Sequence, residues 1–271
     1  GETAELQLNK NHVSANPTSK VLVIATDIAK YGLQSGGEPT QGAGAVAMLI
    51  SQNPRILKLE NETVMLTQDI YDFWRPVGHK YPMVDGPLSN ETYVQSFQKV
   101  WTRYQEKYQR HLTDFAALAF HIPYTKMGKK ALLAILENET EGEQTRMLEQ
   151  YEASVTYSRR VGNLYTGSLY LGLISLLENS NSLQANQRIG LFSYGSGAVC
   201  ELFSGLLVEG FETYLEKDAH LALLENRQPL SMADYETMFA DDLDTAITAS
   251  FDDLTPFSIQ HIENTIRVYR E

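Results

Sequence analysis

Cysteine is almost absent from this chain, since Cys200 is the only one in 271 residues. A single cysteine excludes an internal disulfide framework and fits a reducing compartment, so we expect a cytoplasmic protein. No charge-free apolar run approaches the roughly 20 residues that a membrane-spanning helix needs. The opening residues also lack the basic and apolar segments of a signal peptide. The composition therefore predicts a globular protein that does not act in a membrane.

Positive charge is scarce as well, because 22 Lys and Arg face 34 Asp and Glu, for a formal net charge of −12. This balance argues against nonspecific binding of nucleic acid. A polyanionic ligand would need a local group of cations, and Lys126, Lys129 and Lys130 are the best candidates. No His, Cys, Asp or Glu cluster has the spacing of metal ligands, and neither a P-loop nor a GxGxxG motif is present. We therefore expect no metal site and no nucleotide-cofactor site of these kinds.

Short apolar runs alternate with helical patterns along the chain, without repeats or linkers, which favours a single α/β unit built in layers. The continuous run at 21–26 predicts a central strand covered on both faces. We expect 60–90 to be irregular with short strands, and Ser231 to cap a helix. The other expected strands are 43–50, 115–120, 189–194 and 198–207, and the expected helices are 2–13, 92–112, 126–136, 142–160, 163–177 and 231–239.

Three polar residues follow predicted strands and point to one common site. Asp27, His121 and Ser196 each stand where a strand ends. In layered α/β folds, ligands bind beyond the carboxyl ends of the strands.

His121 precedes a Pro-Tyr-x-Lys sequence. A strand-end imidazole can take a proton from a carbon acid or a thiol, or hydrogen-bond a thioester oxygen. The alternative is a core histidine with a structural hydrogen bond, which this context disfavours. Lys126 and Lys130 lie four residues apart on one helix face, where they either form a solvated surface or hold phosphate groups.

Other polar residues have both a structural and a functional interpretation. Asn163 is either a helix N-cap or a donor to a developing oxyanion. The turn at 195–197 suits an ordinary hairpin, or could bind a carboxylate or carbonyl. Asp27 and Asp72 lie among apolar and aromatic neighbours, as hydrogen-bond hubs or site residues. Cys200 lies in an apolar segment and is expected to serve packing.

Seven stretches together resemble the 3-hydroxy-3-methylglutaryl-CoA (HMG-CoA) synthase family in its bacterial form, within the thiolase superfamily. A ketoacyl synthase III would be expected to show His-Gln-Ala-Asn where this chain has His121-Ile122-Pro123-Tyr124. The segments that carry the resemblance are 26–31 (TDIAKY), 39–47 (PTQGAGAVA), 71–76 (YDFWRP), 81–89 (YPMVDGPLS), 120–130 (FHIPYTKMGKK), 160–170 (RVGNLYTGSLY) and 192–198 (FSYGSGA).

The resemblance implies a layered αβαβα thiolase-like fold that lacks the N-terminal part of its first half. On this basis 1–271 is a single thiolase-like unit, with 1–55 the remainder of the N-terminal half and 56–271 the C-terminal half. The implied reaction condenses acetyl-CoA with acetoacetyl-CoA to HMG-CoA and CoA in the mevalonate pathway. CoA thioesters are the substrates, no cofactor is expected, and a homodimer is expected by analogy.

The resemblance also implies roles for individual residues. His121 would assist acetoacetyl-CoA binding and proton transfer, and Asn163 and Ser196 would contact the acyl group and its oxygens. Lys126 and Lys130 would hold the CoA moiety. Thr40 and Ser89 would line the substrate pocket, and Asp27, Tyr31 and Asp72 would support the site through hydrogen bonds.

The family's nucleophilic cysteine precedes a Tyr-Gly-x-Thr-Ala sequence, whereas this chain opens with Gly1-Glu2-Thr3-Ala4. The resemblance therefore places the nucleophile two residues before Gly1, and the glutamate that acts as general acid/base further upstream. An activated thiolate is needed for covalent acyl transfer. The alternative function is a catalytically silent subunit that binds CoA thioesters or serves a structural role.

Overall fold

The computed structural model describes residues 2–240 and 247–270. The chain groups into two compact units, Gly1–Leu224 and Glu225–Glu271, which we describe separately. The interpretation of 1–271 as one thiolase-like unit with halves at 1–55 and 56–271 stays a prediction beside this division.

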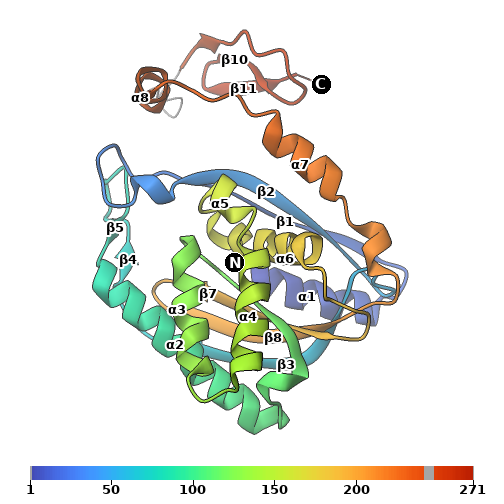
Figure 1. Cartoon of the computed structure of the whole chain (residues 1–271). Coiled ribbons are helices and arrows are strands. Elements are labelled where there is room, and N and C mark those ends of the chain that lie inside the picture. Colours follow the sequence, from blue (N-terminus) through green and yellow to red (C-terminus); the bar gives the residue numbers. More distant parts are fainter. Residues whose placement is uncertain (1, 241–246, 271) are drawn as a thin grey trace. The chain divides into compact units, whose positions relative to one another are not determined.

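A mixed four-stranded sheet forms the centre of the first unit (Figure 1). The three strands expected at 115–120, 189–194 and 198–207 are confirmed, because their apolar runs are buried on both faces. The strand at 115–120 runs parallel to its neighbour at 188–195, and the other neighbouring pairs of this sheet are antiparallel. The strand order is β3 (Leu57–Thr67), β8 (Val199–Leu207), β7 (Arg188–Gly195) and β6 (Phe115–Phe120).

The stretch 60–90 was expected to be irregular with short strands, which β4 (Phe73–Trp74) and β5 (Met83–Val84) confirm, but the 11-residue strand β3 was not predicted. Its sequence carries Glu60 and Glu62 inside an apolar pattern, and its register with β8 shifts between Leu59 and Thr63. The two carboxylates are tolerated because Arg188 and Arg110 pair with them. Sequence alone does not reveal these distant partners.

Helices pack on both faces of this sheet. Consecutive strand residues alternate between the faces, so Phe120 and Phe192 pack toward α2, α3 and α4, while Ala119 and Leu191 pack toward α1 and α6. Figure 1 shows α2, α3 and α4 side by side. The helices are α1 (Glu2–Ala15), α2 (Gly86–Tyr108), α3 (Thr125–Leu136), α4 (Glu141–Ser154) and α6 (Ser168–Asn179).

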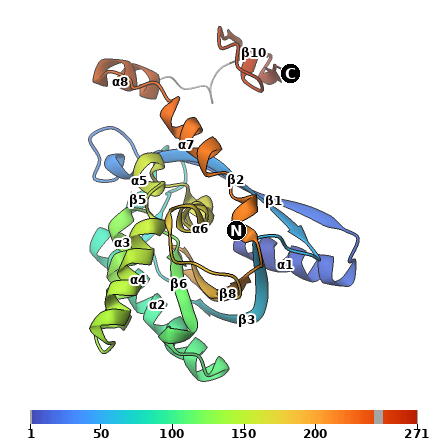
Figure 2. The ribbon, with the colours of Figure 1, turned by 45° about the vertical axis from the view of Figure 1, so that its right-hand side comes forward.

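Strands β1 (Lys20–Ala29) and β2 (Gly42–Ser51) form a separate antiparallel ribbon alongside α1 (Figure 2). Both strands were expected, but the prediction that 21–26 is covered on both faces is wrong for this chain. Val23 and Ala25 are 5% and 0% exposed, whereas Leu22 and Ile24 are 57% and 53% exposed. Only the face toward α1 and α6 is packed by described residues.

Helix boundaries differ from the predictions in several places, and α2 spans Gly86–Tyr108 where 92–112 was expected. The helix expected at 142–160 is divided into α4 and a short α5 (Ser158–Val161). The helix expected from Asn163 begins only at Ser168, after a 3₁₀ turn at Tyr165–Gly167. Gly162 interrupts the helical path with a φ of 85°, a conformation that favours glycine.

The second unit contains α8 (Met232–Ala240) and a three-stranded antiparallel sheet in the order β11 (Ile266–Tyr269), β10 (Ile259–Glu263) and β9 (Ala249–Ser250). The expected cap is confirmed, since Ser231 Oγ accepts the backbone N–H of Asp234 at 3.1 Å.

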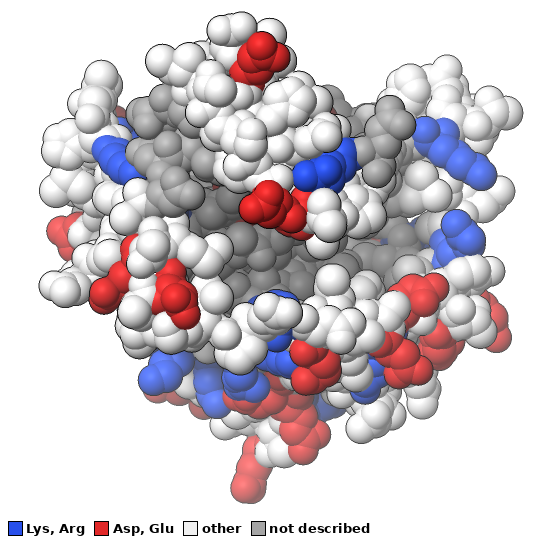
Figure 3. All heavy atoms as spheres, turned by 90° about the horizontal axis from the view of Figure 1, so that it is seen from above, with Lys and Arg blue, Asp and Glu red and all other residues white. Residues whose placement is uncertain are grey.

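Within the described residues, 2–240 and 247–270, no helix combines the length and the apolar character that crossing a membrane requires. Acidic and basic side chains are interspersed on the face shown in Figure 3.

Candidate active site

His121 lies at the carboxyl end of β6, where the sheet ends. Its backbone N–H donates to the Phe192 carbonyl of β7 at 2.7 Å, and its own carbonyl accepts the Tyr93 hydroxyl at 2.6 Å. The side chain is only 9% exposed. Burial lowers the pKa of the imidazole to about 4, although a hydrogen bond to the Tyr165 carbonyl opposes this shift. A neutral ring that donates from one nitrogen leaves the other as a proton acceptor.

Asn163 is 3% exposed and is oriented by hydrogen bonds on both ends of its amide. Its Nδ2 donates to the Tyr31 hydroxyl at 2.8 Å. Its Oδ1 accepts the Tyr165 backbone N–H at 2.8 Å and the Ser168 hydroxyl at 3.1 Å. The oxygen therefore organises the turn before α6, while Nδ2 has a second hydrogen for a ligand.

Two glycines let the backbone of the loop that carries Asn163 pack directly against the backbone at the start of β2. A Cβ on Gly162 would stand 2.0 Å from the Gln41 carbonyl oxygen, and one on Gly42 would stand 2.5 Å from the Val161 carbonyl oxygen. This approach lets the Asn163 backbone N–H donate to the Thr40 carbonyl at 3.0 Å. Thr40 and Asn163, far apart in sequence, therefore lie together.

Tyr31 belongs to an aromatic cluster with Phe73 and Tyr165, in which ring centroids are 6.0 to 6.3 Å apart. Burial raises the pKa of Tyr31, and the nearby Asp27 charge raises it too, so the phenol stays neutral. Tyr165 hydrogen-bonds the Tyr31 hydroxyl and has a left-handed backbone with a φ of 45°. Sequence reasoning gave Tyr165 no role, although it stands within the recognised 160–170 segment.

The buried carboxylate of Asp72, which is 0% exposed, supports the turn at 195–197. Its carboxylate accepts the Tyr194 hydroxyl at 3.2 Å, the Ser196 hydroxyl at 2.9 Å and the Gly197 N–H at 3.2 Å. The Tyr194 ring lies 6.5 Å from that of His121, between centroids. The structure thus places Asp72 as a support of the turn, with Ser196 exposed above it.

The two lysines of α3 have different surroundings. Lys126 is exposed in the first turn, and no side chain within the described ranges bonds its ammonium. Lys130 donates to Asn90 Oδ1 at 2.8 Å and contacts the Tyr124 hydroxyl at 3.3 Å. Lys126 is therefore the better placed of the two to meet a ligand phosphate.

A pocket of about 190 Å³ is walled by 39–40, 122–125, 158–159 and Gly162, which include the sequence neighbours of His121 and Asn163 but neither residue itself. Thr40 lines it, as expected from the sequence. Ser89 does not line it, although the next residue, Asn90, bonds Tyr124 at the rim. The roles predicted for the individual residues remain predictions.

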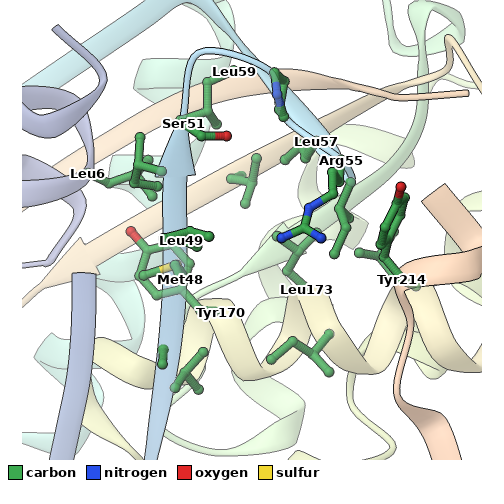
Figure 4. Close-up of a pocket in the computed structure, with 18 of the residues that line it drawn as sticks. Leu6, Met48, Leu49, Ser51, Arg55, Leu57, Leu59, Tyr170, Leu173 and Tyr214 are labelled. Atoms are coloured by element: carbon green, nitrogen blue, oxygen red, sulfur yellow. The ribbon is translucent and has the colours of Figure 1, made fainter. Parts of the chain in front are cut away.

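A larger cavity of about 470 Å³ lies toward the other end of β2 (Figure 4). Its walls are mainly aliphatic, with Leu6, Met48, Leu57 and Leu173 among them. None of the predicted site residues lines it. Volume alone would select this cavity, but the titratable and donor groups gather around His121, so we place the candidate active site there.

Comparisons with known proteins show which family this chain resembles. The family model "Hydroxymethylglutaryl-coenzyme A synthase C terminal" matches residues 61–151 and 143–250. Hydroxymethylglutaryl-CoA synthase of Enterococcus faecalis is 65% identical over 270 residues, which cover 100% of this chain and 70% of that protein. The polyketide biosynthesis 3-hydroxy-3-methylglutaryl-ACP synthase PksG of Bacillus subtilis is 29% identical over 256 residues, covering 88% of this chain and 60% of the relative.

A solved structure of an HMG-CoA synthase complexed with CoA superposes with a TM-score of 0.94 at 44% identity, covering 100% of this chain and 71% of that one. The thiolase-like α/β fold expected from the resemblance is thereby confirmed. This chain covers 70% of the Enterococcus protein at 65% identity. The chain therefore belongs to the hydroxymethylglutaryl-CoA synthase family.

Proposed function

We propose that this protein is an acyltransferase that condenses acetyl-CoA with acetoacetyl-CoA and, with one water, gives HMG-CoA and CoA in the mevalonate pathway. The observation that carries the proposal is a buried, neutral His121 beside the oriented amide of Asn163, in a chain 65% identical to such an enzyme. Their neighbours in the sequence, Ile122 and Gly162, line a pocket of about 190 Å³.

Carbon–carbon bond formation adds a carbanion to the ketone of acetoacetyl-CoA and turns the ketone oxygen into an alkoxide. A donor that already points at that oxygen stabilises the transition state, and Asn163 Nδ2 supplies one. His121 stays neutral at physiological pH, so it can accept a proton during the reaction.

The test uses the natural full-length polypeptide that contains this chain. We expect sustained release of free CoA, followed with a thiol reagent, only when acetyl-CoA and acetoacetyl-CoA are both present. Intact mass after incubation with acetyl-CoA alone should rise by one acetyl group. If the protein instead released free thiol from acyl carrier protein thioesters and did not respond to acetoacetyl-CoA, it would be a ketoacyl synthase.

The environment of Cys200 bears on the alternative function, a catalytically silent subunit that binds CoA thioesters. It is 2% exposed, and burial raises the pKa of its thiol to about 12, so it cannot supply the reactive thiolate. This agrees with its expected packing role. Cys200 is therefore not assigned to covalent acyl transfer. A silent CoA-thioester-binding subunit is the second candidate, and it predicts binding without turnover.

Lys126 provides a prediction about the CoA moiety. Replacing Lys126 with alanine is expected to raise the KM for acetoacetyl-CoA by about two- to fivefold, the scale of one exposed ion pair. The effect should shrink at 0.5 M salt, where the charge is screened. Lys58→Ala, an exposed lysine on β3, is the matched control. A KM that is unchanged at low salt would remove Lys126 from the binding site.

Two wider properties belong to the same proposal. The lone thiol suits a reducing compartment, which supports a cytoplasmic location. A homodimer is proposed by analogy, because closed two-fold pairs are the commonest assemblies of soluble enzymes.

A further inference from the structure

Tyr165 makes hydrogen bonds with three residues of the candidate active site. Its backbone N–H donates to Asn163 Oδ1 at 2.8 Å. Its carbonyl accepts a hydrogen bond from the imidazole of His121, and its hydroxyl hydrogen-bonds that of Tyr31. Because all three bonds come from one residue, the conformation of Tyr165 sets how the imidazole and the amide lie relative to each other.

The backbone of Tyr165 is left-handed, with a φ of 45°. Residues other than glycine adopt this conformation rarely, and it persists only where the surrounding contacts enforce it. The residue opens the 3₁₀ turn Tyr165–Gly167, between Asn163 and α6. Glycine would adopt the same backbone without strain. A tyrosine at this position therefore has to offer, through its side chain, a contact that compensates for the strain.

The side chain of Tyr165 is held in an aromatic cluster. Its ring centroid lies 6.2 Å from that of Tyr31 and 6.3 Å from that of Phe73. Burial raises the pKa of Tyr165, and the hydrogen bond with Tyr31 and the nearby Asp27 charge raise it further, so the phenol keeps its proton. The ring is therefore fixed by packing, and its neutral hydroxyl is available to bond Tyr31.

The Tyr31 hydroxyl connects Tyr165 to the amide of Asn163. It accepts a hydrogen from Asn163 Nδ2 at 2.8 Å. A hydroxyl has one hydrogen and two lone pairs, so its second partner decides which way the lone pairs point. With Tyr165 as that partner, a lone pair of Tyr31 stays directed at Asn163. The second hydrogen of Nδ2 then keeps a fixed direction toward the substrate oxygen.

We propose that Tyr165 is a positioning residue for the condensation: its hydroxyl, acting through the hydroxyl of Tyr31, orients the Asn163 amide toward the substrate oxygen. The inference rests on the proposed function and deepens it. In this role Tyr165 acts through another residue and not on the substrate itself. Its contribution belongs to the transition state, because an amide aimed in advance needs no reorientation as negative charge develops.

Replacing Tyr165 with phenylalanine in the natural full-length polypeptide removes the hydroxyl and keeps the ring and both backbone hydrogen bonds. We expect kcat for condensation to fall about three- to tenfold, the scale of one hydrogen bond, with the KM for acetoacetyl-CoA unchanged. Tyr108→Phe is the matched control, since it also removes a part-buried hydroxyl, which bonds the Thr63 carbonyl on β3 at 3.0 Å. The control should retain the wild-type kcat.

Double variants distinguish positioning from a general loss of packing. If the hydroxyl of Tyr165 acts through Tyr31 and Asn163, Tyr165→Phe should have almost no further effect on kcat in a Tyr31→Phe or an Asn163→Ala background. A packing defect would instead lower kcat by the same factor in every background.

An unchanged kcat for Tyr165→Phe, beside an active wild type, would overturn the inference and leave the proposed function standing. The same fold-loss in the wild-type and Asn163→Ala backgrounds would overturn it too. If the wild type itself failed to condense the two thioesters, the proposed function would fail, and crystal structures would then decide on Tyr165 alone. Loss of the hydrogen bond from Asn163 Nδ2 to Tyr31 in Tyr165→Phe, but not in Tyr108→Phe, would support its positioning role. Retention of that bond with wild-type geometry would refute it.

Discussion

Replacing His121 with alanine is expected to lower kcat by about 10²–10⁴-fold, the usual contribution of a positioned acid or base. The fold should survive, because the two backbone hydrogen bonds at this position, from the His121 N–H and to its carbonyl, do not involve the imidazole. The loss should fall on kcat more than on KM, since the ring acts on the proton and the phosphates are bound elsewhere. Rates and far-UV circular dichroism of the full-length polypeptide would measure both properties.

The pH profile gives a second, independent measurement of the same residue. Burial lowers the pKa of His121 to about 4, below the 6.5 of an exposed histidine, so the ring remains neutral as pH falls through 6.5. Protonation of His121 should therefore reduce kcat/KM only near pH 4. His12→Ala, which removes an exposed imidazole on α1, should leave the rate unchanged. Full activity of His121→Ala would refute its assigned role.

The strands that place the site could be predicted because their burial is continuous in sequence. The run Phe115 to Phe120 is apolar on both faces, so it could only be a covered strand, and His121 at its end followed. The exposed face of β1 could not be read from its sequence. Leu22 and Ile24 are as apolar as Val23, and exposure depends on what packs against a strand. Strand β3 was hidden because the partners of its carboxylates, Arg188 and Arg110 among them, are distant in sequence.

In the candidate site, too, residues with a distinctive local sequence could be predicted, and residues that act through tertiary contacts could not. His121 and Asn163 stand in distinctive local contexts and were predicted. Asp72 was predicted to support the site through hydrogen bonds, and the structure shows that it accepts three from the 194–197 turn. Tyr165 was missed, since it acts through a left-handed backbone and a hydrogen bond to the distant Tyr31 hydroxyl.

Replacing Asn163 with alanine is expected to lower kcat by about 10²–10³-fold, the typical cost of removing one oxyanion donor. The amide is fixed before substrate arrives, because Tyr31 accepts one Nδ2 hydrogen and Oδ1 accepts the Tyr165 N–H. Such preorganisation means that no reorientation is needed as negative charge develops on the substrate oxygen. Single-turnover rates with acetoacetyl-CoA would isolate this step from binding and product release.

Asn163→Asp separates the donor role from the structural one. A carboxylate of the same shape can still accept from the Tyr165 N–H and the Ser168 hydroxyl, so the turn before α6 should remain. It cannot donate to a substrate oxyanion, and its charge would repel one. We therefore expect both variants to lose activity to a similar degree. If Asn163→Asp kept most of the wild-type rate while Asn163→Ala lost it, the acceptor oxygen would be the important atom and Asn163 would be a support for the Tyr165 turn rather than an oxyanion donor.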